Sequence, residues 1–260
     1  AGSVVTRDIP AGVVAAGSAD EARDVEHARA MVLHSALHPP GQVDTAGLEY
    51  SVCYEPSDVI HGLGGDWYDI MVLPKNRTYL AVGDIVGHGL TAVEDMAQLR
   101  SAGRAFAHQG LSADRLLADL NGFTGDVIRG EFATAVVAIF DHQTSVLSYC
   151  SAGHPPAFLR RAETGEVVRL SDANGPVLGP MRDSTYTEGV VQVRPGDLLV
   201  MYTDGLVEDA SASIAVGIAS AERLIAAGPP DALLDTSALA ERLAPRPRPD
   251  DICLVVVRFG

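Results

Sequence analysis

Acidic side chains stand beside glycine or proline in four separate stretches of this 260-residue chain, and each stretch borders an apolar run. The first stretch also holds the only tryptophan, directly after a glycine pair. These side chains are Asp66 and Asp69 in "GLGGDWYDI", Asp84 in "AVGDIVGHG", Asp204 and Glu208 in "LLVMYTDGLVE", and Asp250 and Asp251 in "RPDDICLVVV".

Each aspartate taken alone has an ordinary interpretation, because aspartate beside glycine commonly caps a turn. Four such clusters at strand ends favour a second interpretation. If the sheets bring these ends together, the carboxylates repel one another even at an effective dielectric constant near ~20. They must then take up protons or bind cations. All-oxygen ligands favour Mg²⁺ or Mn²⁺ over zinc.

Alternating or β-branched apolar runs predict strands, and helix-spaced apolar residues between the second and third run predict a helix pair. This order differs from a βαβ rhythm, so we expect an α+β sandwich of antiparallel sheets with helices outside. The expected strands cover 48–54, 78–86, 132–140, 145–152, 197–203 and 252–259, and the expected helices cover 20–37, about 90–109, a segment from about 112, and 213–227, with an apolar patch at 231–243.

The composition restricts the domain organisation and the partners. Residues 1–25 are small and aperiodic, which predicts a linker or tail before one domain over 26–260. The net charge of −15 argues against nucleic acid and against anionic membranes. No apolar run approaches the roughly 18 residues of a membrane helix. Three widely spaced cysteines predict buried thiols of a reducing, cytoplasmic compartment.

Six motifs occur in one order: "GGDWYD", "VGDIVGHG", "FATAVVAIFD", "SAGHPPAFL", "LLVMYTDGLVE" and "DDICLVVV". Together they resemble the metal-dependent PPM (protein phosphatase 2C-like) serine/threonine phosphatases, in the bacterial SpoIIE/RsbU-like branch, over residues 28–260. The resemblance implies an αββα sandwich of two antiparallel sheets flanked by helices. It also implies a site at one end of the sandwich for two Mn²⁺ or Mg²⁺ ions.

The resemblance also implies roles for individual residues. Asp69 and Glu208 are expected to support the fold or the ligands rather than to bind metal, and Trp67 and Tyr68 are expected to pack. The implied ligands are Asp84 as the bridging carboxylate with the main-chain carbonyl of Ile85 beside it, Asp66 for one metal, and Asp204 with Asp250 or Asp251 for the other, Asp250 being favoured.

The sequence departs from the better-known members of the family in two places. The arginine that holds phosphate ahead of the first acidic motif is missing, and the same stretch offers only His61. The position two residues after Asp84 holds Val86 rather than histidine. His88 is a candidate general acid that would protonate the leaving oxygen, but structuring the turn between Gly87 and Gly89 is the favoured role. His154 is expected to pack in a loop.

The leading hypothesis is a phosphoserine/phosphothreonine protein phosphatase in which water activated by metal attacks the phosphorus. By resemblance, its substrate is an anti-anti-sigma factor with a STAS domain, and the helix over 20–37 either follows a sensor domain or belongs to the fold. The alternatives are a catalytically weak regulatory or interaction module and a nucleotide phosphodiesterase. Intact acidic motifs argue against the first alternative, and 5% aromatic content argues against the second.

Overall fold

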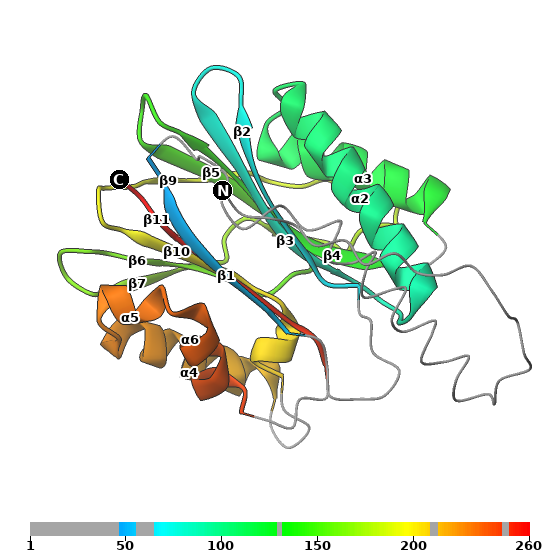
Figure 1. Cartoon of the computed structure of the whole chain (residues 1–260). Helices are drawn as coiled ribbons and strands as arrows, with labels where there is room; N and C mark the ends of the chain where they lie inside the picture. Colours follow the sequence, from blue (N-terminus) through cyan, green and yellow to red (C-terminus); the bar gives the residue numbers. More distant parts are fainter. Residues whose placement is uncertain (1–46, 56–64, 129–131, 209–212, 246–249) are drawn as a thin grey trace, which may run out of the picture.

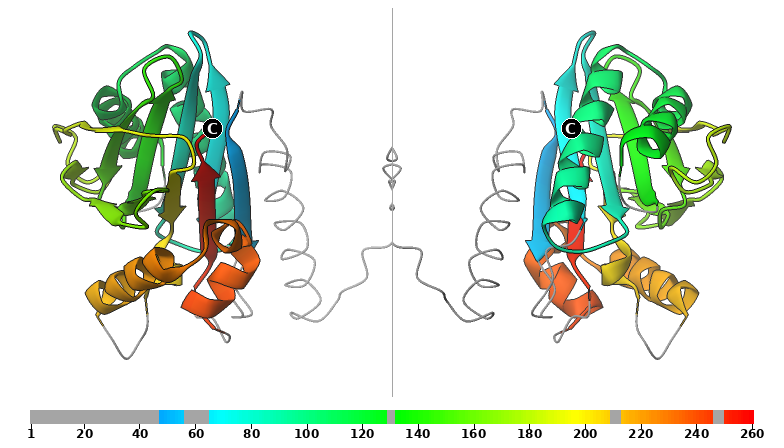
Figure 2. Two further views of the ribbon diagram at one scale, coloured as in Figure 1. Left: turned by 90° about the vertical axis from the view of Figure 1, so that its left-hand side faces the viewer. Right: turned by 90° about the vertical axis from the view of Figure 1, so that its right-hand side faces the viewer.

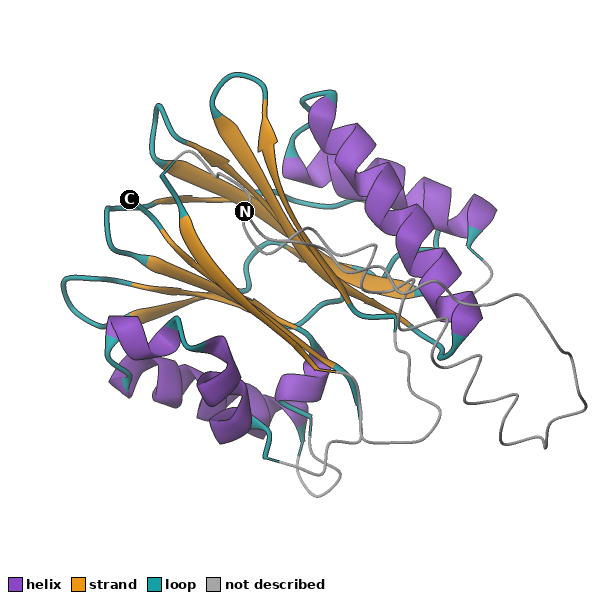
Figure 3. Cartoon of the chain, viewed as in Figure 1, coloured by secondary structure: helices purple, strands orange, loops and turns teal. Residues whose placement is uncertain are grey.

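The computed structural model describes residues 47–55, 65–128, 132–208, 213–245 and 250–260. The expected linker over 1–25, the expected helix over 20–37 and His61 lie outside these ranges. The ribbon shows two sheets stacked face to face, with one group of helices on each outer side (Figures 1 and 3). The expected α+β sandwich of antiparallel sheets is therefore confirmed.

One sheet has the order β2-β3-β4-β5-β8, and β9 pairs with β5. Its long central strands are antiparallel, and Asp84 of β3 lies opposite Thr134 of β4. The strands are β2 (Trp67–Leu73), β3 (Arg77–Ile85), β4 (Ala133–Asp141), β5 (Val146–Ala152), β8 (Asn174–Gly175) and β9 (Gly189–Gln192).

The other sheet has the order β1-β11-β10-β6-β7, with every neighbouring pair antiparallel. The side views show the long strands β1 and β11 of this sheet beside each other (Figure 2). The strands are β1 (Glu49–Glu55), β6 (Ala157–Arg160), β7 (Val167–Leu170), β10 (Leu198–Tyr202) and β11 (Ile252–Arg258).

The helices form because apolar residues recur at helical spacing and face a sheet. In α2, the buried residues Val93, Met96, Leu99, Gly103 and Ala107 lie on one stripe. The helices α2 and α3 pack on the β2–β5 sheet, and α4 and α6 pack on the other sheet. The bounds are α2 (Leu90–His108), α3 (Ala113–Val127), η1 (Asp204–Leu206), α4 (Ile214–Ala227), α5 (Pro230–Leu233) and α6 (Thr236–Leu243).

Three apolar layers hold the sandwich together. The central layer joins inward-facing residues of both sheets, such as Val82 and Val255, and the two outer layers lie between a sheet and its helices. All three cysteines are buried and none forms a disulfide bond, as expected. No helix in the described part of the chain combines the length and the apolar character needed to cross a membrane.

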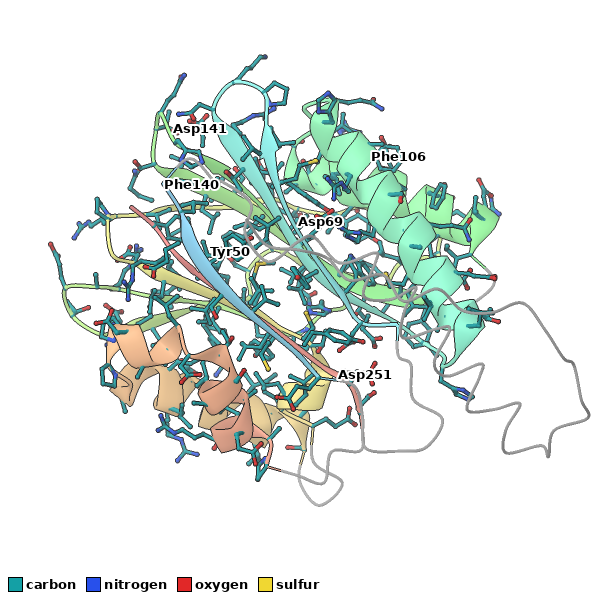
Figure 4. The ribbon with its side chains drawn as sticks, viewed as in Figure 1. Tyr50, Asp69, Phe106, Phe140, Asp141 and Asp251 are labelled. Atoms are coloured by element: carbon teal, nitrogen blue, oxygen red, sulfur yellow. The ribbon has the colours of Figure 1, made fainter. Side chains whose placement is uncertain are left out.

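The strand directions place the acidic motifs at one end of this sandwich. Strand β3 ends just after Asp84, and β2 begins just after Asp66. In the other sheet, β10 ends just before Asp204 and β11 begins just after Asp251. Figure 4 shows Asp251 at this end and Asp141 at the opposite end.

Candidate functional site

Gly65, directly before Asp66, lets two backbone segments approach closely. A Cβ on Gly65 would lie 2.4 Å from the carbonyl oxygen of Ile85, so a larger residue would push β2 away from β3. The ring of Trp67 packs on Gly83, where a Cβ would lie 2.3 Å from ring carbons. Trp67 therefore packs as expected, and the close contact sets buried Asp66 beside the end of β3.

A second glycine brings together the two acidic segments of the other sheet. Asp204 opens the short helix η1 directly after β10. The next residue, Gly205, lies so close to β11 that a Cβ would come within 2.0 Å of the carbonyl oxygen of Asp251. Asp204 and the Asp250–Asp251 pair therefore sit next to each other because residue 205 has no side chain.

The two adjacent aspartates before β11 differ in environment. Asp250 is exposed, and its Oδ1 accepts a hydrogen bond of 2.8 Å from the backbone N–H of Asp251. Asp251 is buried, and its Oδ2 accepts a hydrogen bond of 3.1 Å from the hydroxyl of Tyr54 on β1. Asp251 is thus held by the fold, whereas Asp250 faces solvent.

The carboxyl groups of the two sheets lie close enough for their negative charges to raise one another's pKa values. Burial raises the pKa of Asp66 well above its ordinary value, and the negative charge of Asp84 raises it further. Burial also raises the pKa of Asp84, as do the charges of Asp204 and Asp250 from the other sheet. The pKa of Asp204 is raised by burial first, then by Asp250 and Glu208. These shifts mean that the folded chain gathers negative charge at this end of the sandwich.

Among the residues that the structure describes, no ion pair neutralises these four carboxylates. None of the ion pairs between described residues includes Asp66, Asp84, Asp204 or Asp250. Within the same residues, no group of three or more His, Cys, Asp or Glu side chains is arranged so that it could hold a metal ion. The donor set is nevertheless all carboxylate and carbonyl oxygen, and within the described residues its charge has no ion-pair partner, which fits hard divalent cations such as Mg²⁺ and Mn²⁺.

Three other candidate residues have separate settings. Asp69 is buried beside α2 and pairs with Arg100 at 3.4 Å and Arg104 at 3.3 Å, so it supports the fold, as expected. Glu208 is exposed, and its backbone N–H bonds the carbonyl of Asp204 at 2.7 Å. His88 is exposed between Gly87 and Gly89, whose φ angles of 132° and 78° favour glycine.

His154 connects the two sheets beneath this end of the sandwich. Its Nε2 lies 2.9 Å from the carbonyl oxygen of Tyr202, and its Nδ1 lies 2.8 Å from the hydroxyl of Thr134. A carbonyl only accepts, so Nε2 carries the proton, and Nδ1 accepts from Thr134. Burial lowers the pKa of His154 to about 4, which keeps the ring neutral. The packing role expected for His154 is confirmed by these contacts.

This neutral histidine predicts a loss of stability in mild acid. The folded pKa lies below the ordinary value of 6.5, so below that pH the unfolded chain binds the proton first and stability falls as pH decreases toward 4. The contribution of His154 between pH 7 and pH 5 is about 2 kcal/mol. Urea unfolding of wild type and His154→Gln at both pH values measures this contribution, as the difference between the two proteins in the pH dependence of the free energy of unfolding. Equal pH dependence in the two proteins would contradict it.

Sequence reasoning missed Thr203 and Tyr54. Thr203 is fully buried, and its hydroxyl donates a hydrogen bond of 2.7 Å to Oδ2 of Asp66 across the gap between the sheets. Tyr54 reaches Asp251 from β1. The sequence offered one signal for Thr203, namely its position directly before Asp204. Its bond to Asp66 could not be predicted, because the two residues are distant in sequence and meet only when the sheets are stacked.

Comparison with known proteins places the chain in a family. The family described as Stage II sporulation protein E (SpoIIE) matches residues 74–260. The phosphoserine phosphatase RsbU of Bacillus subtilis is 28% identical over 147 residues, which cover 56% of this chain and 43% of RsbU. The chain spans less than half the length of the curated relatives it matches.

Solved structures share the fold. The crystal structure of the RsbU and RsbW domains of Rv1364c from Mycobacterium tuberculosis has a TM-score of 0.69 at 30% identity, over 82% of this chain and 60% of that one. The PP2C phosphatase domain of SpoIIE from Bacillus subtilis, in a structure with a fragment of its regulatory domain, has a TM-score of 0.68 at 20% identity, over 82% and 63% of the respective chains. With the family match over residues 74–260, the fold and the sequence agree, and the chain belongs to the SpoIIE family.

Proposed function

We propose that this domain is a Mn²⁺- or Mg²⁺-dependent protein serine/threonine phosphatase. The observation that carries the proposal is the convergence of Asp66 and Asp84 from one sheet with Asp204 and Asp250 from the other, without a basic partner among the described ion pairs. The RsbU relative is named a phosphoserine phosphatase, which supports the same activity.

Two cations are proposed at this end of the sandwich. Asp84 would lie between them, with the carbonyl of Ile85 beside it. Asp66 would serve one cation, and Asp204 with Asp250 would serve the other. Asp250 is favoured over Asp251 because Asp251 is buried and bonded to Tyr54, whereas Asp250 is exposed. When bound, such ions lower the pKa of a water and neutralise the phosphoryl group.

The chain's own contribution is to hold charged oxygens in place. The contact of Gly65 with Ile85 and the contact of Gly205 with Asp251 fix the two acidic segments of each sheet relative to one another. His88 stays a candidate for the proton donor to the leaving oxygen, since it is exposed four residues after Asp84. Its general-acid role is a prediction that a pH–rate profile of His88→Ala would examine.

The substrate is proposed to be a folded protein that presents phosphoserine or phosphothreonine, in particular a STAS-domain anti-anti-sigma factor. Cations alone do not distinguish one phosphoserine from another, so recognition must use surfaces beside the site. Exposed apolar side chains adjoin the acidic motifs in sequence: Val86 and Leu90 follow Asp84, and Ile214 begins α4 after Asp204. The proposed contact segments at 55–63 and 205–215 lie partly outside the described residues.

The test compares kcat/KM for a phosphorylated STAS-domain protein, a peptide with the same phosphosite, and a phosphotyrosine peptide, all with Mn²⁺. We expect the protein to be hydrolysed at least about tenfold more efficiently than the peptide, which corresponds to about 1.4 kcal/mol of transition-state stabilisation. Phosphotyrosine should be a poor substrate. Equal values for protein and peptide would contradict partner recognition, and no hydrolysis of either would contradict phosphatase activity.

A further inference from the structure

The hydroxyl of Thr203 sits where three acidic segments meet. Thr203 directly precedes Asp204, and its side chain is 0% exposed. Its Oγ1 lies 2.7 Å from Oδ2 of Asp66 and 2.9 Å from the backbone nitrogen of Cys253, two residues after Asp251. This buried oxygen therefore contacts the segment of Asp66 and the segment that follows Asp251, and it belongs to the residue directly before Asp204. The end of β3 is the segment with a candidate ligand that it does not reach.

The direction of each hydrogen bond follows from the groups involved. The backbone N–H of Cys253 can only donate, so Oγ1 of Thr203 accepts this bond. The single hydroxyl proton then has two acceptors within reach, Oδ2 of Asp66 at 2.7 Å and the carbonyl of Cys253 at 3.5 Å. The shorter contact and the charge of a carboxylate favour Asp66.

The backbone at this point is also fixed. The backbone N–H of Thr203 donates to the carbonyl of Cys253 at 3.0 Å, which holds β10 and β11 in register beside the hydroxyl. The Nε2–H of His154 donates to the preceding carbonyl, that of Tyr202, at 2.9 Å. These hydrogen bonds hold the backbone of Thr203 in place. Its hydroxyl reaches from the β10–β11 sheet to the start of β2.

We propose that Thr203 is a positioning residue for the cation site: its hydroxyl holds Oδ2 of Asp66, which leaves Oδ1 to meet a divalent cation, and ties Asp66 to the segments of Asp204 and Asp250. The inference rests on the proposed function, because it assumes that Asp66 binds a cation. A partner that orients a metal-binding carboxylate commonly changes metal affinity by about 10–100-fold when it is removed.

The test measures Mn²⁺ affinity directly. The full chain is titrated with Mn²⁺, and electron paramagnetic resonance measures how much of the ion stays free. Thr203→Val keeps the shape of the side chain and removes the hydroxyl, and it should weaken Mn²⁺ binding by about tenfold or more. Thr203→Ser restores the hydroxyl and should bind within about threefold of wild type, which a purely structural role of the methyl group would not predict.

Thr78→Val is the matched control. Thr78 is also fully buried, but it lies in β3 at the end of that strand opposite to Asp84, where its hydroxyl lies 2.8 Å from Nε2 of His142. This variant should bind Mn²⁺ as wild type does, even if it is less stable. If Thr203→Val does not fold, Thr203→Ala is compared with Thr203→Ser, and the alanine variant must bind more weakly.

The outcomes separate the two proposals. Weak binding by Thr203→Val with recovery in Thr203→Ser supports the positioning role. Equal affinity of wild type and Thr203→Val, or of the alanine and serine variants, overturns it while leaving the metal site intact. If wild type itself binds no Mn²⁺, the proposed metal-dependent function fails, and the positioning role fails with it.

Discussion

Asp84→Asn is expected to lower phosphatase turnover by about 1,000-fold, equivalent to about 4 kcal/mol of activation barrier. The reason is that Asp84 is the carboxylate whose charge is linked to residues of both sheets, through Asp66 on one side and Asp204 and Asp250 on the other. An amide has the same shape but lacks the charge that a bridging ligand must supply. Activity above about a tenth of wild type would mean that Asp84 does not bridge the cations.

The same substitution is expected to leave the cation-free protein at least as stable as wild type. Burial and the charges of Asp204 and Asp250 raise the pKa of Asp84, so its ionised form is disfavoured in the folded state. Replacing it by a neutral side chain removes this repulsion. Thermal unfolding in chelator compares the two proteins, and a large drop in the melting temperature of Asp84→Asn would show that its lost activity reflects unfolding.

Asp141→Asn is the matched control. Asp141 lies at the opposite end of the same sheet, opposite Arg77 (Figure 4). Its Oδ1 accepts hydrogen bonds from the backbone N–H groups of Gln143 and Thr144, and these bonds, that of Thr144 foremost, lower the pKa of its carboxyl. This variant should therefore keep full activity and lose some stability, the reverse of the result expected for Asp84→Asn.

The long elements were predictable because each has a clear local pattern. The apolar run of "TYLAVGDIV" predicted β3, and the helical stripe with Val93 and Leu99 predicted α2. The sandwich followed from their order along the chain. Strand β2 was missed because Asp69 interrupts its apolar run and is buried only through its pairing with Arg100 and Arg104 of α2. Strands β6 to β9 were missed because each has only two to four residues.

The candidate site was predictable only as far as its acidic residues. Asp66, Asp84 and Asp204 were visible because each stands between an apolar run and a glycine. The two glycine contacts that bring the segments together, the choice between Asp250 and Asp251, and the hydroxyl of Thr203 all depend on packing between strands distant in sequence. No periodicity within one segment carries that information.

Removal of divalent cations is expected to abolish turnover and to lower stability. The gathered carboxylates repel one another without a cation, and a bound ion reverses this penalty. With free Mn²⁺ at 100 times its Kd, one bound ion adds about 2.7 kcal/mol to the free energy of unfolding. Wild type should therefore be stabilised by Mn²⁺ in a thermal unfolding experiment, and Asp84→Asn should respond much less.

The central claim is that hydrolysis depends on hard divalent cations held by these carboxylates. It is tested most directly by hydrolysis of a phosphoserine protein after treatment with chelator and gel filtration, followed by addition of Mn²⁺, Mg²⁺ or Zn²⁺. The account predicts no turnover in the treated protein, recovery with Mn²⁺ or Mg²⁺, and poor recovery with Zn²⁺, because the proposed ligands are all oxygens. Turnover that persists after chelation would contradict it.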